Sequence, residues 1–162
     1  MTLRTLGPHR FDRLVRLIRA FDREAEKCAK IRSYYAACVL EAAVLEGLLV
    51  AVCDAYMEKV ESYLAQLPSR RRPQGQIWEW GLADLIRVAA ELEWLPKRSG
   101  PRGRLKIGDL VGVVKELRNL VHPGRHVRQY PNLRLRSGHY QDAYEIVRAA
   151  SARIDSHVVR RL

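Results

Sequence analysis

Residues 34–56, YYAACVLEAAVLEGLLVAVCDAY, form an almost uninterrupted apolar run that contains no proline and a single glycine. A helix that is apolar nearly all round belongs in the middle of a bundle, where neighbours cover every face. The run is long enough to be mistaken for a membrane span, but Glu41 and Glu46 within it would be costly in hydrocarbon. We therefore expect the core helix of a soluble, cytoplasmic protein that does not contact a membrane, starting near Ser33 and ending at Pro68.

The sequence on both sides of this run also has helical periodicity. Apolar residues recur at spacings of three and four, which is typical of amphipathic helices. The pattern predicts further helices at about 11–28, 82–92, 107–121 and 139–158, separated by loops at 68–76 and 97–106. No stretch alternates with the period of a strand. We predict an all-α fold of four long helices over residues 33–162, with residues 1–32 as an N-terminal helical extension packed on the same domain.

The cysteines give no sign of a metal site or of a disulfide framework. There are three, Cys28, Cys38 and Cys53, and no pair has the C-x-x-C spacing. We expect free, buried thiols and no metal or other cofactor.

The positive charge is concentrated in one window. The chain has a net charge of +11, and residues 96–136 hold eleven basic and two acidic side chains, a net charge of +9. Such a surplus favours a polyanionic partner, most simply RNA or another nucleic acid. The residues that we expect to bind RNA are Lys97, Arg98, Arg102, Arg104, Arg125 and Arg128.

The same window contains the motif LRNLVHP, residues 117–123. Arg118 and His122 are four residues apart, so on a helix they project from the same face. Histidine exchanges protons near neutral pH, and a guanidinium stabilises negative charge on a phosphate. With Asn119 as an orienting group, the three could support metal-free cleavage of RNA by attack of its 2′-hydroxyl. The alternative is an ordinary helix end, since cations near a helix C-terminus are favoured by its dipole and Pro123-Gly124 would stop the helix.

This motif resembles the signature of the HEPN family, small α-helical domains in which an Arg, often followed by Asn, precedes a His. The apolar helix with an internal Glu, a second helix and a variable loop before the motif are also similar, so that the resemblance covers roughly residues 33–160. The usual gap between Arg and His is four to six residues, and here it is three. His126, with seven residues between it and Arg118, does not restore the spacing.

The resemblance implies a metal-independent endoribonuclease, often a toxin or defence effector, that acts as a homodimer with one composite site. It assigns proton transfer to His122, phosphate stabilisation to Arg118 and positioning to Asn119. Either Glu41 or Glu46 could hold Arg118. Some relatives are non-catalytic modules, so binding of nucleic acid or of a partner protein such as a cognate antitoxin is the alternative function.

Overall fold

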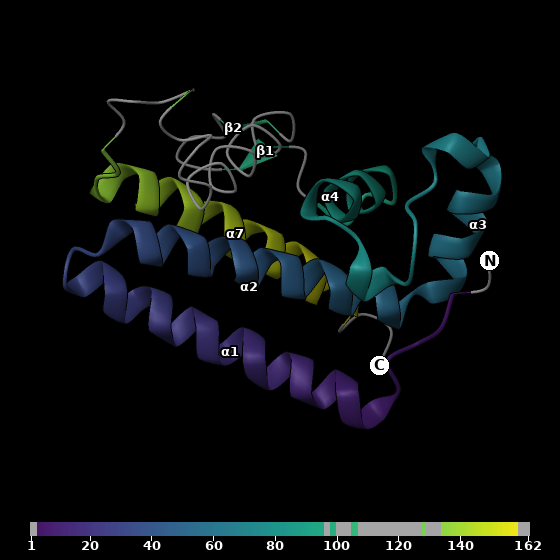
Figure 1. Ribbon diagram of the computed structural model, residues 1–162, viewed down its shortest axis with the longest axis horizontal. Helices are drawn as coiled ribbons and strands as arrows, with labels where there is room; N and C mark the ends of the chain where they lie inside the picture. Colours follow the sequence, from purple (N-terminus) through teal and green to yellow (C-terminus); the bar gives the residue numbers. More distant parts are fainter. Residues whose placement is uncertain (1–2, 96–97, 100–104, 107–127, 129–133, 159–162) are drawn as a thin grey trace.

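The computed structural model describes residues 3–95, 98–99, 105–106, 128 and 134–158. Apart from one pair of two-residue strands, the regular elements of the described part are all helices, as the sequence predicts (Figure 1). The long helices are α1 (Pro8–Lys30), α2 (Tyr34–Ala55) and α7 (Ser137–Val158), and the shorter ones are α3 (Met57–Gln66), α4 (Leu82–Glu91) and the 3-10 turns Ser69–Arg71 and Ile77–Glu79.

Helix α2 is the centre of the described structure. It packs against both α1 and α7, which lie on either side of it in Figure 1. Gly47 allows α1 to approach α2 closely, because a Cβ atom at this position would lie 2.6 Å from Cγ1 of Ile18. Among the described residues, α2 alone is long and apolar enough to span a membrane, but half of its most apolar window is buried within the protein.

The main core lies where α2 meets α4 and α7. Its largest fully buried side chains include Leu45, Leu49, Ile77, Leu85 and Ile86. Trp80 and Trp94 are also buried, while Trp78 is exposed. Two of the three tryptophans therefore pack into the core, as expected for aromatic residues at the ends of an apolar stripe.

The predicted single helix from Ser33 to Pro68 is wrong in one respect: it is two helices. Helix α2 ends at Ala55, Tyr56 has a non-helical backbone, and α3 leaves in another direction (Figure 1). No proline or glycine marks the break. Tertiary contacts accompany it instead, since the Tyr56 ring lies 5.6 Å from that of Trp94 and Asp54 accepts a hydrogen bond from the backbone N–H of Leu6.

The sequence analysis predicts a loop at 97–106, but four of these residues form a pair of short strands. Strand β1 (Arg98–Ser99) pairs antiparallel with β2 (Leu105–Lys106), with Arg98 opposite Lys106. The predicted helix at 107–121 lies outside the described residues. The division into an extension at 1–32 and a domain at 33–162 stays a prediction.

Candidate functional site

The predicted catalytic residues Arg118, Asn119 and His122 lie outside the described residues. The same holds for Lys97, Arg102, Arg104 and Arg125. Of the predicted RNA-binding residues, Arg98 is in strand β1 and Arg128 has an exposed side chain. The predicted site therefore stays a prediction, and the candidate site described next, made of described residues, was not predicted as a unit.

Charged side chains from α1, α2 and α7 meet where the three long helices pack together, with Glu41 buried and Asp22 and Arg148 partly exposed. The Arg148 guanidinium on α7 donates hydrogen bonds to both carboxylate oxygens of Asp22 on α1, with Nη1 lying 3.2 Å from Oδ2. Its Nη2 also lies 3.9 Å from Oε2 of Glu41 on α2, which is within ion-pair range but too long for a hydrogen bond. One guanidinium is thus shared by two carboxylates, and it fastens α1 to α7 across α2.

Glu41 is the most unusual member of this cluster. Its side chain is fully buried, and neither carboxylate oxygen has a hydrogen-bond partner in the described part of the chain. Burial raises the pKa of Glu41 to about 7; Arg148 lowers it, while the charges of Asp22 and Glu26 raise it further. The carboxyl is therefore poised between its neutral and charged forms near neutral pH, and its hydrogen-bonding capacity is unused.

Neighbouring groups respond to the same environment. The Arg148 guanidinium lies over the Tyr144 ring at 4.9 Å. Burial, and then the Glu41 charge, raise the pKa of Tyr140 to about 12 and that of Cys38 to about 11. Both groups are therefore neutral at physiological pH, so neither the phenol nor the thiol is activated as a nucleophile.

A cavity of about 340 Å³ adjoins the cluster, between α1, α2 and α7. Its walls are largely apolar, with Phe11, Val15 and Ile18 contributed by α1 and Val44, Leu48 and Val52 by α2. Asp22 and Arg148 form part of the lining. Within the described residues, no group of three or more His, Cys, Asp or Glu could hold a metal ion, and Cys28, Cys38 and Cys53 are free thiols.

The sequence analysis singled out Glu41 but missed Asp22 and Arg148. The spacing of Asp22 could have identified it. It follows Ile18 by four residues, so this acid lies at the edge of the apolar stripe of α1. Arg148 has a similar position between the buried residues Val147 and Ala150. No local pattern shows that these two residues, 126 positions apart, are partners.

Comparisons with protein-family profiles, with curated proteins and with solved structures find no match to this chain. The geometry of the described residues and the sequence motif are therefore the basis for a functional proposal.

Proposed function

We propose that this protein is a metal-independent endoribonuclease of the HEPN type, cytoplasmic and related to toxin or defence systems, that cleaves single-stranded RNA. The observation that carries the proposal is the motif Arg118-Asn119-Leu120-Val121-His122, which follows a long apolar helix with an internal Glu in an all-α chain. The fold that we propose for residues 33–162 is the HEPN-like bundle.

In the proposed reaction, the 2′-hydroxyl of a nucleotide attacks the adjacent phosphorus and the bond to the 5′-oxygen breaks. His122 removes the proton of the attacking hydroxyl, and His122 of a second copy protonates the leaving oxygen. Arg118 stabilises the extra negative charge on the phosphate, and Asn119 positions it. The products are a 2′,3′-cyclic phosphate and a free 5′-hydroxyl, and DNA is not cleaved because it lacks the 2′-hydroxyl.

The burial of α2 supports Glu41 over Glu46 as the residue that holds Arg118. Glu46 has an exposed side chain, whereas Glu41 is fully buried and both its oxygens lack hydrogen-bond partners among the described residues. A buried carboxylate with unused acceptors is strongly stabilised by a guanidinium. We assign Glu41 as the positioning residue for Arg118.

The test is cleavage of a single-stranded RNA by the purified protein in EDTA. We expect cyclic phosphate ends, and we expect His122→Ala to lower the rate by at least about a hundredfold, the usual contribution of general acid–base catalysis. His9→Ala is the matched control, since His9 is exposed on α1 and should cleave like the wild type. Equal rates for His122→Ala and the wild type would rule out this function.

The second candidate is a non-catalytic helical module that binds nucleic acid, or a partner protein with an acidic face such as a cognate antitoxin. The net charge of +11 and the three-residue gap between Arg118 and His122 favour it. This module would bind RNA without turnover, and the affinity would fall as salt rises.

A further inference from the structure

The outward face of α1 carries a row of six cationic side chains. They lie outside the basic window at residues 96–136. The row consists of residues three or four positions apart, and we call it the basic ridge: Arg13, Arg16, Arg19, Arg23, Lys27 and Lys30. At about 100° per residue, all six fall within a sector of about 120° that lies opposite the apolar stripe. Every one of them is exposed.

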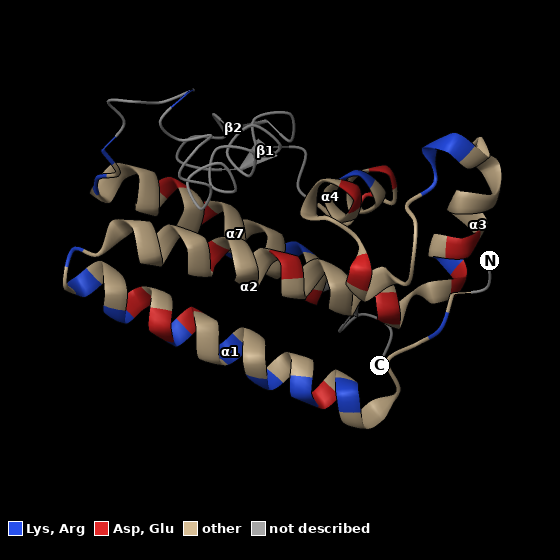
Figure 2. Cartoon of the chain, in the orientation of Figure 1, with Lys and Arg blue, Asp and Glu red and all other residues tan. Residues whose placement is uncertain are grey.

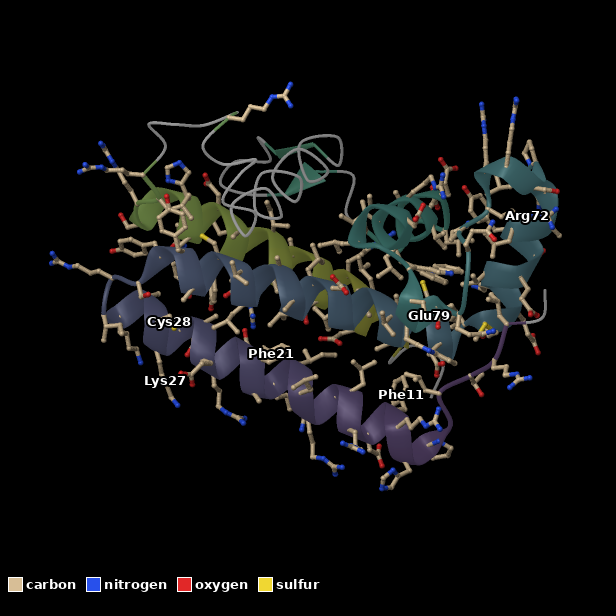
Figure 3. All side chains as sticks on the ribbon, in the orientation of Figure 1. Phe11, Phe21, Lys27, Cys28, Arg72 and Glu79 are labelled. Atoms are coloured by element: carbon tan, nitrogen blue, oxygen red, sulfur yellow. The ribbon has the colours of Figure 1, made fainter. Side chains whose placement is uncertain are left out.

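Figures 2 and 3 show the same division of α1. Blue segments, which mark Lys and Arg, recur along the outer edge of α1 (Figure 2). The apolar residues Leu14, Ile18 and Phe21 pack on the core instead. Phe21 points toward α2 and packs on the core, while Lys27 points away from it (Figure 3).

The ridge is poorly neutralised by the protein itself. Lys27 forms an ion pair with Glu24. The other five side chains of the ridge form no ion pair or hydrogen bond with described residues. Asp22 is turned away to Arg148, and Asp12 is the one acid within the sector. Each neighbouring pair on the ridge therefore places like charges at i,i+3 or i,i+4, which destabilises a helix. An anionic partner would remove this repulsion.

The length and the chemistry of the ridge suit a phosphate backbone. From Arg13 to Lys30 the helix rises about 26 Å, which is long enough to contact several phosphates of one nucleic-acid strand. Four of the six cations are arginine, whose forked guanidinium matches phosphate oxygens. A membrane surface fits less well, because interfacial helices insert their apolar face and that of α1 is covered by α2.

We propose that the basic ridge of α1 binds the phosphate backbone of a nucleic acid. The contact is independent of base sequence, since phosphates carry no sequence information. It does not depend on RNA cleavage, and it lies on a different part of the chain from the 118–122 motif.

The test measures binding of a single-stranded DNA of about 20 nucleotides, which 2′-hydroxyl chemistry cannot cleave, at several salt concentrations. The ridge variant is Arg13→Gln/Arg16→Gln/Arg23→Gln. The control variant, Arg4→Gln/Arg70→Gln/Arg71→Gln, removes the same charge from exposed positions elsewhere. Arg72 is left intact because it donates hydrogen bonds to the carbonyls of Leu67 and Ala65.

Log affinity falls as log salt rises, and we expect the ridge variant to make this slope shallower by about 2. Its affinity should be about a hundredfold weaker than that of the wild type at 0.1 M salt. The control variant should change the slope by less than about 0.5, and Arg13→Lys/Arg16→Lys/Arg23→Lys should keep most of the wild-type slope. Circular dichroism verifies that each variant is folded.

A difference in slope below about 1 between the ridge and control variants would overturn the proposal. So would binding of phosphatidylserine vesicles that depends on the ridge while DNA binding does not, which would assign the ridge to a membrane surface. If the wild-type protein does not cleave RNA but shows ridge-dependent DNA binding, the proposed nuclease function is wrong and the proposal for the ridge stands.

Discussion

Glu41 shows how one residue can have a cost for folding and still be informative about function. Its carboxyl is surrounded by Cys38 and Tyr140, which are neutral, by Arg148, and by the acids Asp22 and Glu26. Burial without a hydrogen bond penalises the charged form. The folded state therefore binds a proton at Glu41 more tightly than the unfolded chain does.

This raised pKa predicts a loss of stability as pH rises. Below about pH 4.5 the carboxyl is protonated in both states, and between that value and about 7 the unfolded chain releases its proton first. The free energy of unfolding should fall over this interval by roughly 3 kcal/mol on account of Glu41, and by less where Glu41 is paired with Arg118, because a guanidinium partner lowers the pKa of a carboxyl. Glu41→Gln, which does not titrate, should remove that part of the decline.

Urea unfolding at pH 5 and pH 8 measures this effect. Other titrating groups, including Asp54 with its own raised pKa, cancel when wild type and variant are compared. Glu46→Gln on the exposed side of the same helix should keep the wild-type pH dependence. The raised pKa of Glu41 is refuted if Glu41→Gln and the wild type lose equal stability between the two pH values.

At the scale of the element, two helices end in the same way. The backbone N–H of Ser33 donates to the carbonyl of Cys28 and that of Arg32 to Ala29, which is the Schellman motif. Trp94 and Glu93 make the corresponding bonds to Ala89 and Ala90 at the end of α4. The left-handed position is usually glycine, but here it is Arg32 with φ 61° and Glu93 with φ 59°.

Arg32→Gly should therefore stabilise the protein. Glycine avoids the steric cost of the left-handed backbone, partly offset by its greater freedom in the unfolded chain, for a net gain of about 0.5–1 kcal/mol. Thermal unfolding should show a higher Tm. Lys30→Gly, two residues earlier at the last position of α1, is the matched control and should destabilise by up to about 0.5 kcal/mol. A lower Tm for Arg32→Gly would contradict the left-handed geometry of this turn.

At the scale of the whole molecule, α1 belongs to the same packed unit as α2 and α7. It covers one side of α2 along its length, its approach is permitted by Gly47, and the Asp22–Arg148 pair fastens it to α7. Its charge shows why net charge is an incomplete guide to a binding surface. Residues 8–32 hold eight basic and four acidic side chains, but the helix sorts six of the cations onto one face.

The packing of α1 on α2 can be tested with two neighbouring residues. Ile18 is half-buried against Gly47, whereas Leu17 is 48% exposed. Ile18→Ala should lower the free energy of unfolding by about 1–3 kcal/mol, because it removes part of the contact with α2. Leu17→Ala should change it by less than about 0.5 kcal/mol. If urea unfolding gives equal losses for the two variants, α1 does not pack with this face toward α2.

Much of the secondary structure could be predicted from the sequence. The apolar run at 34–56 identified the central helix, and spacings of three and four identified α1, α4 and α7, because a helix must turn its apolar face to the core. The break at Tyr56 could not be predicted, since no proline or glycine causes it. The catalytic and HEPN assignments depend on residues 118–122 and stay predictions.

What the sequence by itself determined is the all-α class, the helix that fills the centre, and the motif on which the proposed function depends. Only the tertiary structure decided that Glu41 is buried and Glu46 exposed and that Asp22 pairs with Arg148. It also decided that α2 covers the apolar face of α1, which leaves the cations of α1 facing outward. The physical reason is that periodicity records which face of a helix is apolar, which is a local property. Which residue from a distant helix meets a given side chain depends on how the helices pack, and that is decided by the fit of all their surfaces together.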